Sequence, residues 1–126
     1  PKEFDRLFGT STSAYTRLLR QIDVAQENQL ILILKGAYTS IVSGDGSVYF
    51  NSSGNACLAT GGSGDVLTGM ITALLAQGYS EIESAKMATF MHGMTANLWS
   101  EKYKAAPMTA SDIIDLIPQV YNILNS

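Results

Sequence analysis

Apolar and polar residues follow one another along the chain with changing periods, which predict helices at both ends and strands between them. A short opening segment, helical or irregular, is expected over residues 3–8. After the hydroxyl side chains of residues 11–13, which suit a helix start, apolar residues recur at helical spacing from Tyr15 to Ala25. The continuous branched run 30–34 then predicts a strand buried on both faces, as in a parallel sheet covered by helices.

The middle of the chain has the pattern of a hairpin followed by a loop. Two runs rich in β-forming residues, 39–43 and 47–51, flank the turn residues Gly44, Asp45 and Gly46. Ser, Asn, Gly and Thr then dominate up to residue 62, which predicts an irregular connection.

Three helices are expected in the second half. Apolar residues lie nearly all round the segment 65–77, so this helix is predicted to be buried in the centre of the protein. Ser80 and Glu83 have the spacing of a capping box for the next helix. The last helix starts at Thr109, and Pro118 is expected to kink or divide it.

The order of elements indicates an α/β protein, but the three expected strands are fewer than a sheet covered on both faces usually has. The pattern therefore looks like half of such a sheet. The 126 residues, 46% hydrophobic and 15% charged, have a globular composition. A net charge of −3 argues against nucleic acid as a partner, and the longest apolar run is too short to cross a membrane. A single cysteine, Cys57, indicates a cytoplasmic setting.

The segment richest in chemistry is a glycine loop directly before the 65–77 helix. Three glycines, Gly61, Gly62 and Gly64, let backbone N–H groups approach a ligand without side chains in the way. The first turn of the helix adds unpaired N–H donors and the positive end of the helix dipole. This combination predicts an anion site, most naturally for phosphate.

Asp65 is unusual in such a place, because a carboxylate repels a bound phosphate. Its presence makes sense if it takes a proton from a hydroxyl that attacks a phosphoryl group. The plainer alternative is an N-terminal cap after an ordinary glycine turn. The ligand hypothesis gains weight because the start of a helix that is apolar all round should lie in the interior, where its donors need partners. The loop is not a Walker A loop, because no Lys-Ser or Lys-Thr follows the glycines. It is not a dinucleotide-binding fingerprint either, because Leu67 stands where the third glycine should be.

The remaining residues are weaker candidates for a functional role. Lys35 and Gly36 follow the predicted buried strand, where a lysine can reach a phosphate, or can simply be solvated. The lone histidine, His92, is interpreted as a packed core residue in preference to a catalytic one. Cys57 is interpreted as an apolar filler, and Trp99 and Tyr103 as packing residues.

The residues 58–69, Leu-Ala-Thr-Gly-Gly-Ser-Gly-Asp-Val-Leu-Thr-Gly, closely resemble the signature of the ADP- or ATP-dependent NAD(P)H-hydrate dehydratases, which belong to the ribokinase-like superfamily. The first four residues, Pro-Lys-Glu-Phe, look like the end of that family's Thr-Pro-His-Pro-x-Glu-Phe motif. The segments 35–39, 92–93 and 109–112, together with Asn55, also fall in the family order.

The resemblance implies a ribokinase-like three-layer αβα fold, of which residues 1–126 would be the C-terminal part of a single dehydratase domain. The N-terminal part, with its upstream strands and the motif histidine, would be missing from this chain. Members of the family often form homo-oligomers, and some carry an epimerase domain fused in front.

The resemblance also implies an activity, the repair of hydrated NADH and NADPH. Asp65 would deprotonate the hydroxyl of the hydrated ring, the alkoxide would take the terminal phosphoryl group of ADP or ATP, and phosphate would then be eliminated. ADP as donor would leave AMP. Mg²⁺ would arrive on the nucleotide phosphates, since no ligand cluster is apparent. The implied anion hole is Gly62, Ser63 and Gly64, and the implied nucleotide-binding residues are Gly64 with Lys35, Gly36, Ala37, Tyr38 and Thr39. Secondary candidates are Asn55, Thr60 and His92.

Two other functions stay open at this point. The same aspartate and anion hole would serve a ribokinase-like kinase for a sugar or a small hydroxymethyl compound. The chain could also be a nucleotide-binding fragment without chemistry of its own.

Overall fold

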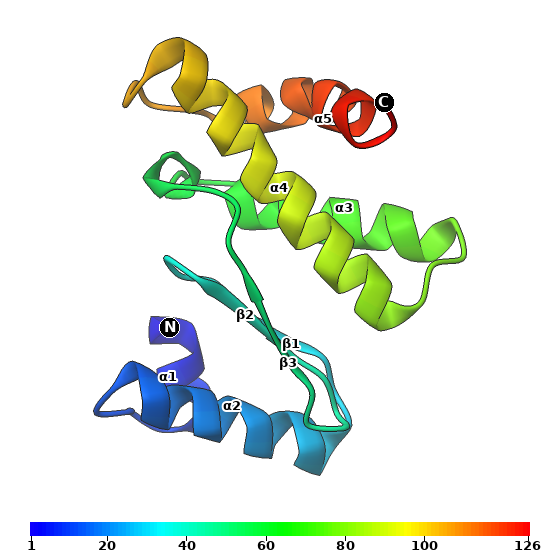
Figure 1. Cartoon of the computed structure of the whole chain (residues 1–126). Coiled ribbons are helices and arrows are strands. Elements are labelled where there is room, and N and C mark those ends of the chain that lie inside the picture. Colours follow the sequence, from blue (N-terminus) through cyan, green and yellow to red (C-terminus); the bar gives the residue numbers. More distant parts are fainter. The chain divides into compact units, whose positions relative to one another are not determined.

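The computed structural model describes all 126 residues, which form two compact units, Pro1–Asn51 and Ser52–Ser126 (Figure 1). The first unit contains two helices and a small sheet, and the second is built mainly from three long helices. No helix combines the length and the apolar character that crossing a membrane requires.

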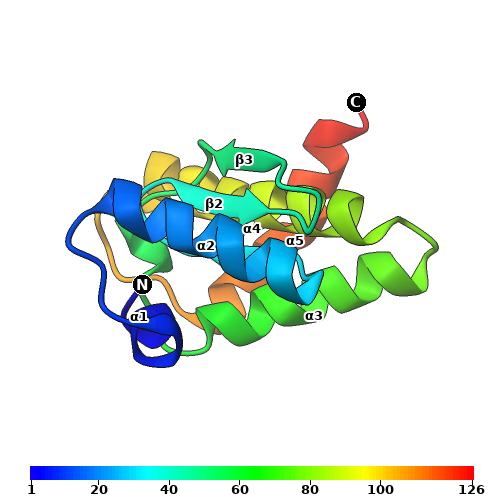
Figure 2. The same cartoon turned by 90° about the horizontal axis from the view of Figure 1, so that it is seen from below.

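In the first unit, helices α1 (Lys2–Phe8) and α2 (Ala14–Asn28) precede three strands, β1 (Leu32–Leu34), β2 (Thr39–Val42) and β3 (Val48–Asn51). The strands form one antiparallel sheet in the order β1-β2-β3. Helix α2 lies along this sheet and contacts β2 (Figure 2). The first long helix and the hairpin are confirmed, and the opening segment, expected as helical or irregular, is a helix.

The strand at 30–34 differs from its prediction. β1 is limited to three residues, is only half-buried, and pairs antiparallel with β2 in the register Leu34 opposite Ser40. The chain turns straight back after Leu34, so no crossover helix intervenes between the two strands. A run of branched apolar residues favours an extended conformation, but it does not specify the direction of the neighbouring strand.

A buried polar link fixes α2 to the sheet. The Gln21 side chain is fully buried and donates from Nε2 to the carbonyl oxygens of Leu32, at 2.9 Å, and Ser40, at 3.3 Å. Ser40 Oγ in turn donates to Gln21 Oε1 at 2.7 Å. This amide is therefore satisfied inside a core formed mainly by Val24, Ala25, Ile41 and Val42.

The second unit contains a short 3-10 helix, η1 (Ala56–Leu58), and the helices α3 (Ser63–Ala76), α4 (Glu81–Tyr103) and α5 (Ala110–Leu124). Helix α4 packs against both α3 and α5 (Figure 1). The capping box of Ser80 and Glu83 is confirmed. Helix α5 continues through Pro118, so the expected division at this residue does not occur.

The core of the second unit lies where α4 meets α5. Ala96, Met108 and Ile113 are buried there, and four partly buried residues pack around them: Cys57, Leu58, Val66 and Trp99. Cys57 thus packs against this core, as expected for a small apolar filler.

Helix α3 is not the buried central helix that its composition predicts. Only Ser63 and Leu67 are buried along its whole length, and Leu75 is 42% exposed. Helices α4 and α5 contact α3 within this unit, but its apolar residues Ala73, Leu75 and Ala76 stay exposed.

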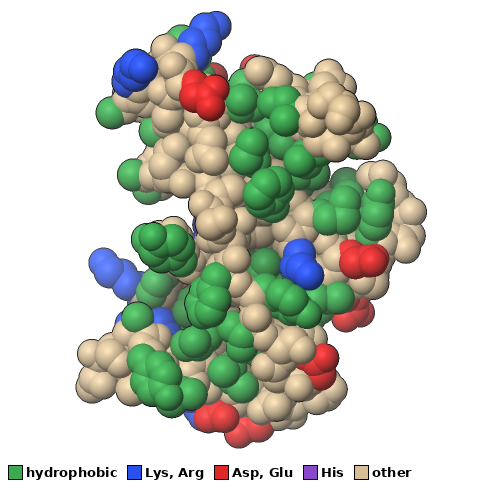
Figure 3. Space-filling model, in the orientation of Figure 1, with side chains coloured by type: hydrophobic (Ala, Val, Ile, Leu, Met, Phe, Trp, Pro, Cys, Tyr) green, Lys and Arg blue, Asp and Glu red, His purple; other side chains and the backbone are tan.

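Large apolar side chains are also exposed elsewhere in both units, and Figure 3 shows hydrophobic side chains at the surface. The first unit exposes Leu7, Tyr15, Leu19, Leu30, Tyr38 and Phe50, and the second exposes Tyr79, Phe90, Tyr103, Ile114, Tyr121, Ile123 and Leu124.

Candidate functional site

The start of α3 leaves backbone donors unpaired. The Ser63 N–H donates to the Thr60 carbonyl oxygen at 3.3 Å, and the first helical bond runs from the Val66 N–H to the Gly62 carbonyl oxygen at 3.1 Å. The N–H groups of Gly64 and Asp65 lie between these two and have no carbonyl acceptor within the helix. No side chain caps this helix. Two adjacent N–H groups are therefore available to an anion.

Gly62 is required for the shape of this helix start. It is the N-cap residue and has the left-handed conformation, with φ +85° and ψ −9°. A Cβ atom at this position would also lie 3.1 Å from the Cβ of Ala110, at the start of α5. A side chain here would be strained by its backbone conformation and crowded by α5. Gly61 has open space around it and carries no such requirement.

Asp65 stands in the first turn of α3, in the same turn as the two unpaired N–H groups. Its side chain and the neighbouring Gly64 are exposed, whereas the loop was expected in the interior. The difference follows from the exposure of α3 described above. The positive end of the helix dipole stabilises a carboxylate in this turn. The arrangement combines donors for an anion with a carboxylate able to accept a proton.

The loop before α3 is fastened to α4 by side-chain hydrogen bonds. Ser53 Oγ donates to the Phe90 carbonyl oxygen at 2.9 Å, and the Gly54 N–H donates to Asn97 Oδ1 at 3.2 Å. Asn55 donates from Nδ2 to the Ala96 carbonyl oxygen at 3.0 Å, and to a serine hydroxyl of α4 at 2.9 Å. Asn55 Oδ1 also accepts from the Cys57 N–H, which caps η1.

The other two secondary candidates, Thr60 and His92, both form hydrogen bonds with Ser63 of the glycine loop. Thr60 is half-buried, accepts from the Ser63 N–H and lines a cavity of about 240 Å³ together with Cys57 and Met108. His92 is buried in α4 with its Nε2 atom 2.9 Å from the Ser63 carbonyl oxygen. The packed interpretation of His92 agrees with this burial. Its contact with the glycine loop was missed, because no local pattern relates two residues so far apart in the chain.

The predicted nucleotide-binding segment belongs to the first unit, whereas the glycine loop belongs to the second. Residues Lys35, Gly36, Ala37 and Tyr38 form the connection between β1 and β2, and Thr39 is the first residue of β2. The first four line a cavity of about 440 Å³, which Tyr15, Gln21 and Phe50 also line. Lys35 thus follows a strand as predicted, but that strand is paired antiparallel.

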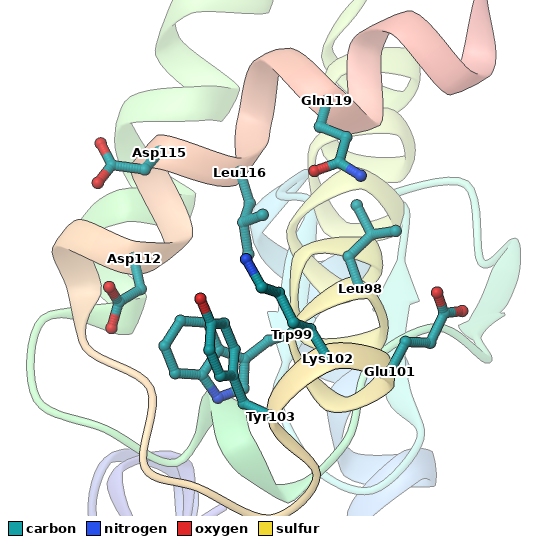
Figure 4. Close-up of a pocket in the computed structure, with 9 residues that line it drawn as sticks. All are labelled: Leu98, Trp99, Glu101, Lys102, Tyr103, Asp112, Asp115, Leu116 and Gln119. Atoms are coloured by element: carbon teal, nitrogen blue, oxygen red, sulfur yellow. The ribbon is translucent and has the colours of Figure 1, made fainter.

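A further cavity of about 460 Å³ lies between the end of α4 and the first half of α5 (Figure 4). The rings of Trp99 and Tyr103 pack together there at a centroid distance of 4.2 Å, in keeping with the expected packing role. Figure 4 shows that Glu101 points away from Asp112 and Asp115, so the acidic side chains do not converge. No group of three His, Cys, Asp or Glu side chains that could hold a metal ion occurs in the chain.

Comparison with known proteins connects these features to one family. The sequence model of a family described as NAD(P)H-hydrate dehydratase matches residues 1–119. A bifunctional NAD(P)H-hydrate repair enzyme from Moorella thermoacetica is 39% identical over 122 residues, which are 95% of this chain and 23% of that protein.

Solved structures agree with this match. The crystal structure of an ADP/ATP-dependent NAD(P)H-hydrate dehydratase from Bacillus subtilis, co-crystallised with ATP and Mg²⁺, superposes with a TM-score of 0.90 at 33% identity, over 98% of this chain and 45% of that one. A ribokinase-like superfamily protein from Enterococcus faecalis superposes with a TM-score of 0.73 at 25% identity, over 96% of this chain and 42% of that one. The predicted ribokinase-like α/β fold is thereby confirmed. The chain spans less than half the length of each of these proteins.

Proposed function

Because the chain belongs to the NAD(P)H-hydrate dehydratase family, we propose that the protein carrying it dehydrates hydrated NADH and NADPH with ADP or ATP as the phosphoryl donor. The observation that carries this proposal is the start of α3. An uncapped first turn with two unpaired N–H groups provides an anion site, and Asp65 provides a proton acceptor in the same turn.

In the proposed reaction, Asp65 accepts the proton of the hydroxyl group on the hydrated nicotinamide ring. The alkoxide oxygen forms a bond to the terminal phosphorus of the nucleotide as the bond from that phosphorus to the leaving phosphate oxygen breaks. The proposed anion hole is the loop of Gly62, Ser63 and Gly64. Within it, the unpaired N–H groups of Gly64 and Asp65 stabilise the negative charge that develops on the transferred group. Inorganic phosphate then leaves with the C–O bonding pair, and loss of a proton from the adjacent ring carbon restores the double bond.

The nucleotide would be held by Gly64 and by the segment Lys35, Gly36, Ala37, Tyr38 and Thr39. Two observations support the second assignment: four of these residues line one cavity, and Lys35 provides a positive charge there. Mg²⁺ would arrive with the nucleotide, as a partner of the phosphates, whose charge it neutralises. The Bacillus subtilis relative was co-crystallised with ATP and Mg²⁺, which supports the two as partners of this protein.

Residues 1–126 are proposed to form the C-terminal part of one dehydratase domain. The coverage of relatives supports this, as does the large number of exposed apolar side chains, among them much of α3. The rest of such a domain would cover part of this surface. A homo-oligomer would cover more of it, and an epimerase domain is a further candidate neighbour, since the Moorella relative is bifunctional. The single cysteine supports a cytoplasmic setting.

The decisive experiment mixes the full-length protein carrying this chain with hydrated NADH, Mg²⁺ and either ADP or ATP. Recovery of the near-ultraviolet absorbance of the reduced nicotinamide ring, with release of inorganic phosphate, is the expected result. Absence of recovery with both donors would contradict the proposal. A stable phosphorylated product, detected by mass spectrometry with sugar or hydroxymethyl substrates, would favour a kinase instead.

A further inference from the structure

A buried hydrogen bond ties the glycine loop to helix α4. His92 is the single histidine of the chain and is 3% exposed, and Ser63 is 1% exposed. The His92 Nε2 atom lies 2.9 Å from the Ser63 carbonyl oxygen and 3.2 Å from Ser63 Oγ. Ser63 is the first residue of α3 and is flanked by Gly62 and Gly64. The one residue of the implied anion hole that has a side chain is therefore held from α4.

The chemistry of the two atoms fixes the direction of the bond. A carbonyl oxygen can only accept, so an imidazole nitrogen at 2.9 Å from it must carry the proton. His92 is therefore protonated on Nε2 and donates to Ser63. The Ser63 carbonyl oxygen has two lone pairs, so it can accept this bond in addition to its place in the helix.

The same bond sets the orientation of a donor in the anion site. The Ser63 carbonyl and the Gly64 N–H belong to one planar peptide group and point in opposite directions across it. A carbonyl held toward His92 therefore directs the Gly64 N–H away from α4. Gly64, on one side of this peptide group, has no Cβ and so allows the group to rotate more easily than another residue would. The bond from the packed side chain of His92 adds to the helical bond of this carbonyl and restrains the rotation.

Helix α4 also holds the beginning of the loop, at Ser53, through Gly93, the residue next to His92. A Cβ atom on Gly93 would lie 2.7 Å from the carbonyl carbon of Ser53, so the backbone lies directly against the helix there. Ser53 Oγ also donates to α4 through the Phe90 carbonyl oxygen. Neighbouring residues of α4, His92 and Gly93, thus hold the loop near residue 53 and at residue 63.

We propose that His92 is a positioning residue for the phosphoryl-transfer step, acting through the Ser63–Gly64 peptide group and not by contact with substrate. This proposal rests on the proposed function. It assigns His92 a role in catalysis that the packed interpretation does not contain.

Two amide substitutions in the full-length protein separate positioning from packing. In His92→Gln the side-chain NH₂ group can reach the place of Nε2, whereas in His92→Asn it ends near the place of Nδ1, too far from Ser63. Ser84→Ala is the matched control, because Ser84 lies buried on the same helix and its hydroxyl has no hydrogen-bond partner. Rates are measured per folded molecule, with the folded fraction taken from near-ultraviolet circular dichroism.

We expect His92→Asn to lower kcat by at least about tenfold while the KM for nucleotide changes by less than about threefold, because misplacement of about 1 Å can cost up to 10²-fold in rate. His92→Gln should recover most of the loss, and Ser84→Ala should match the wild type. A purely packing role would lower the folded fraction without this split. Equal kcat values for the Asn and Gln variants, per folded molecule, would overturn the proposal.

Two further measurements cover the remaining outcomes. If either substitution prevents folding, the ¹⁵N shifts of the wild-type imidazole decide: a proton on Nε2 supports the proposal, and a proton on Nδ1 alone overturns it. If the wild-type protein lacks dehydratase activity, the proposed function fails. His92 is then judged by calorimetric binding of ADP with Mg²⁺. Weaker binding in His92→Asn than in His92→Gln supports the role at an anion site, and equal or absent binding overturns it.

Discussion

Helices α3, α4 and α5 all carry an acidic residue three positions after the N-cap residue, but only α4 and α5 form a capping box. In α4, the N-cap hydroxyl of Ser80 accepts from the Glu83 N–H, and the Glu83 carboxylate accepts from the Ser80 N–H. Thr109 and Asp112 make the same reciprocal pair in α5. In α3 the N-cap residue is Gly62, and the acid three residues later is Asp65.

The difference lies in one side chain. With glycine as the N-cap, no hydroxyl is available to the N–H of Asp65, and no side-chain cap forms. The N–H group and the carboxylate that a capping box would consume are both left for other partners. Two helix starts of the same unit are closed on themselves, and the third is open to a ligand. This contrast, more than the glycines alone, distinguishes a binding loop from an ordinary turn.

The largest expected effect tests the two acids at the same helical position. Asp65→Asn should lower kcat of the full-length protein by about 10²–10⁴-fold, the usual contribution of a general base. Asp112→Asn is the matched control and should leave kcat within about twofold, since its carboxylate only caps α5. Steady-state assay of ring recovery measures both. Equal losses in the two variants would remove the distinction between them.

The second test adds a side chain at the N-cap position of the open helix start. Gly62→Ala should lower the free energy of unfolding by about 1–2 kcal/mol, because a non-glycine residue must adopt the left-handed conformation. Contact with Ala110 should add to this loss. The control is Gly69→Ala in α3, where a Cβ meets open space and should raise stability by about 0.5–1 kcal/mol. Urea unfolding measures both. A Gly62→Ala variant as stable as the wild type would show that the strained conformation is dispensable.

The third test opens one of the closed helix starts. Thr109→Ala should lower the free energy of unfolding by about 1 kcal/mol through loss of the N-cap hydrogen bond. Thr109→Ser keeps the hydroxyl and should retain most of the stability. Thermal unfolding followed by circular dichroism distinguishes the two variants. If both lose stability equally, the methyl group of Thr109 and not its hydroxyl is responsible.

The smallest effect concerns pH. Hydrogen bonds from the Thr109 N–H and hydroxyl hold the pKa of Asp112 below its ordinary value of 3.8, and the bonds to Ser80 do the same for Glu83. Because the folded-state pKa is lowered, the stabilisation is present above the ordinary pKa and is lost as the pH falls through the lowered one. NMR titration of the carboxyl carbons should show both midpoints below the ordinary values. The midpoint of Asp112 should rise in Thr109→Ala, and an unchanged midpoint would contradict this origin.

Much of the fold could be predicted because it depends on local chemistry. The capping box of Ser80 and Glu83 and the turn at Gly44–Gly46 act within a few residues, and both are present as expected. The glycine loop could be identified as a candidate site for the same reason, since its donors and Asp65 belong to one helical turn.

The parts that failed depend on distant neighbours. The composition of α3 predicts burial, but burial is decided by what packs against the helix, and the contacts with α4 and α5 leave Ala73, Leu75 and Ala76 exposed. The run before Lys35 predicts a strand, but its antiparallel partner is set by the turn that follows. The bond between Ser63 and His92 joins residues 29 positions apart, which no periodicity reveals.

The single thiol of these 126 residues offers a native probe of motion. Cys57 is half-buried against the core of Ala96, Met108 and Ile113, directly before the glycine loop. A thiol in this position reacts with a labelling reagent mainly when the surrounding packing opens. Its modification rate therefore reports local opening of the second unit without any engineered residue. Slower labelling in the presence of nucleotide would show that a ligand at the loop restrains the core behind it.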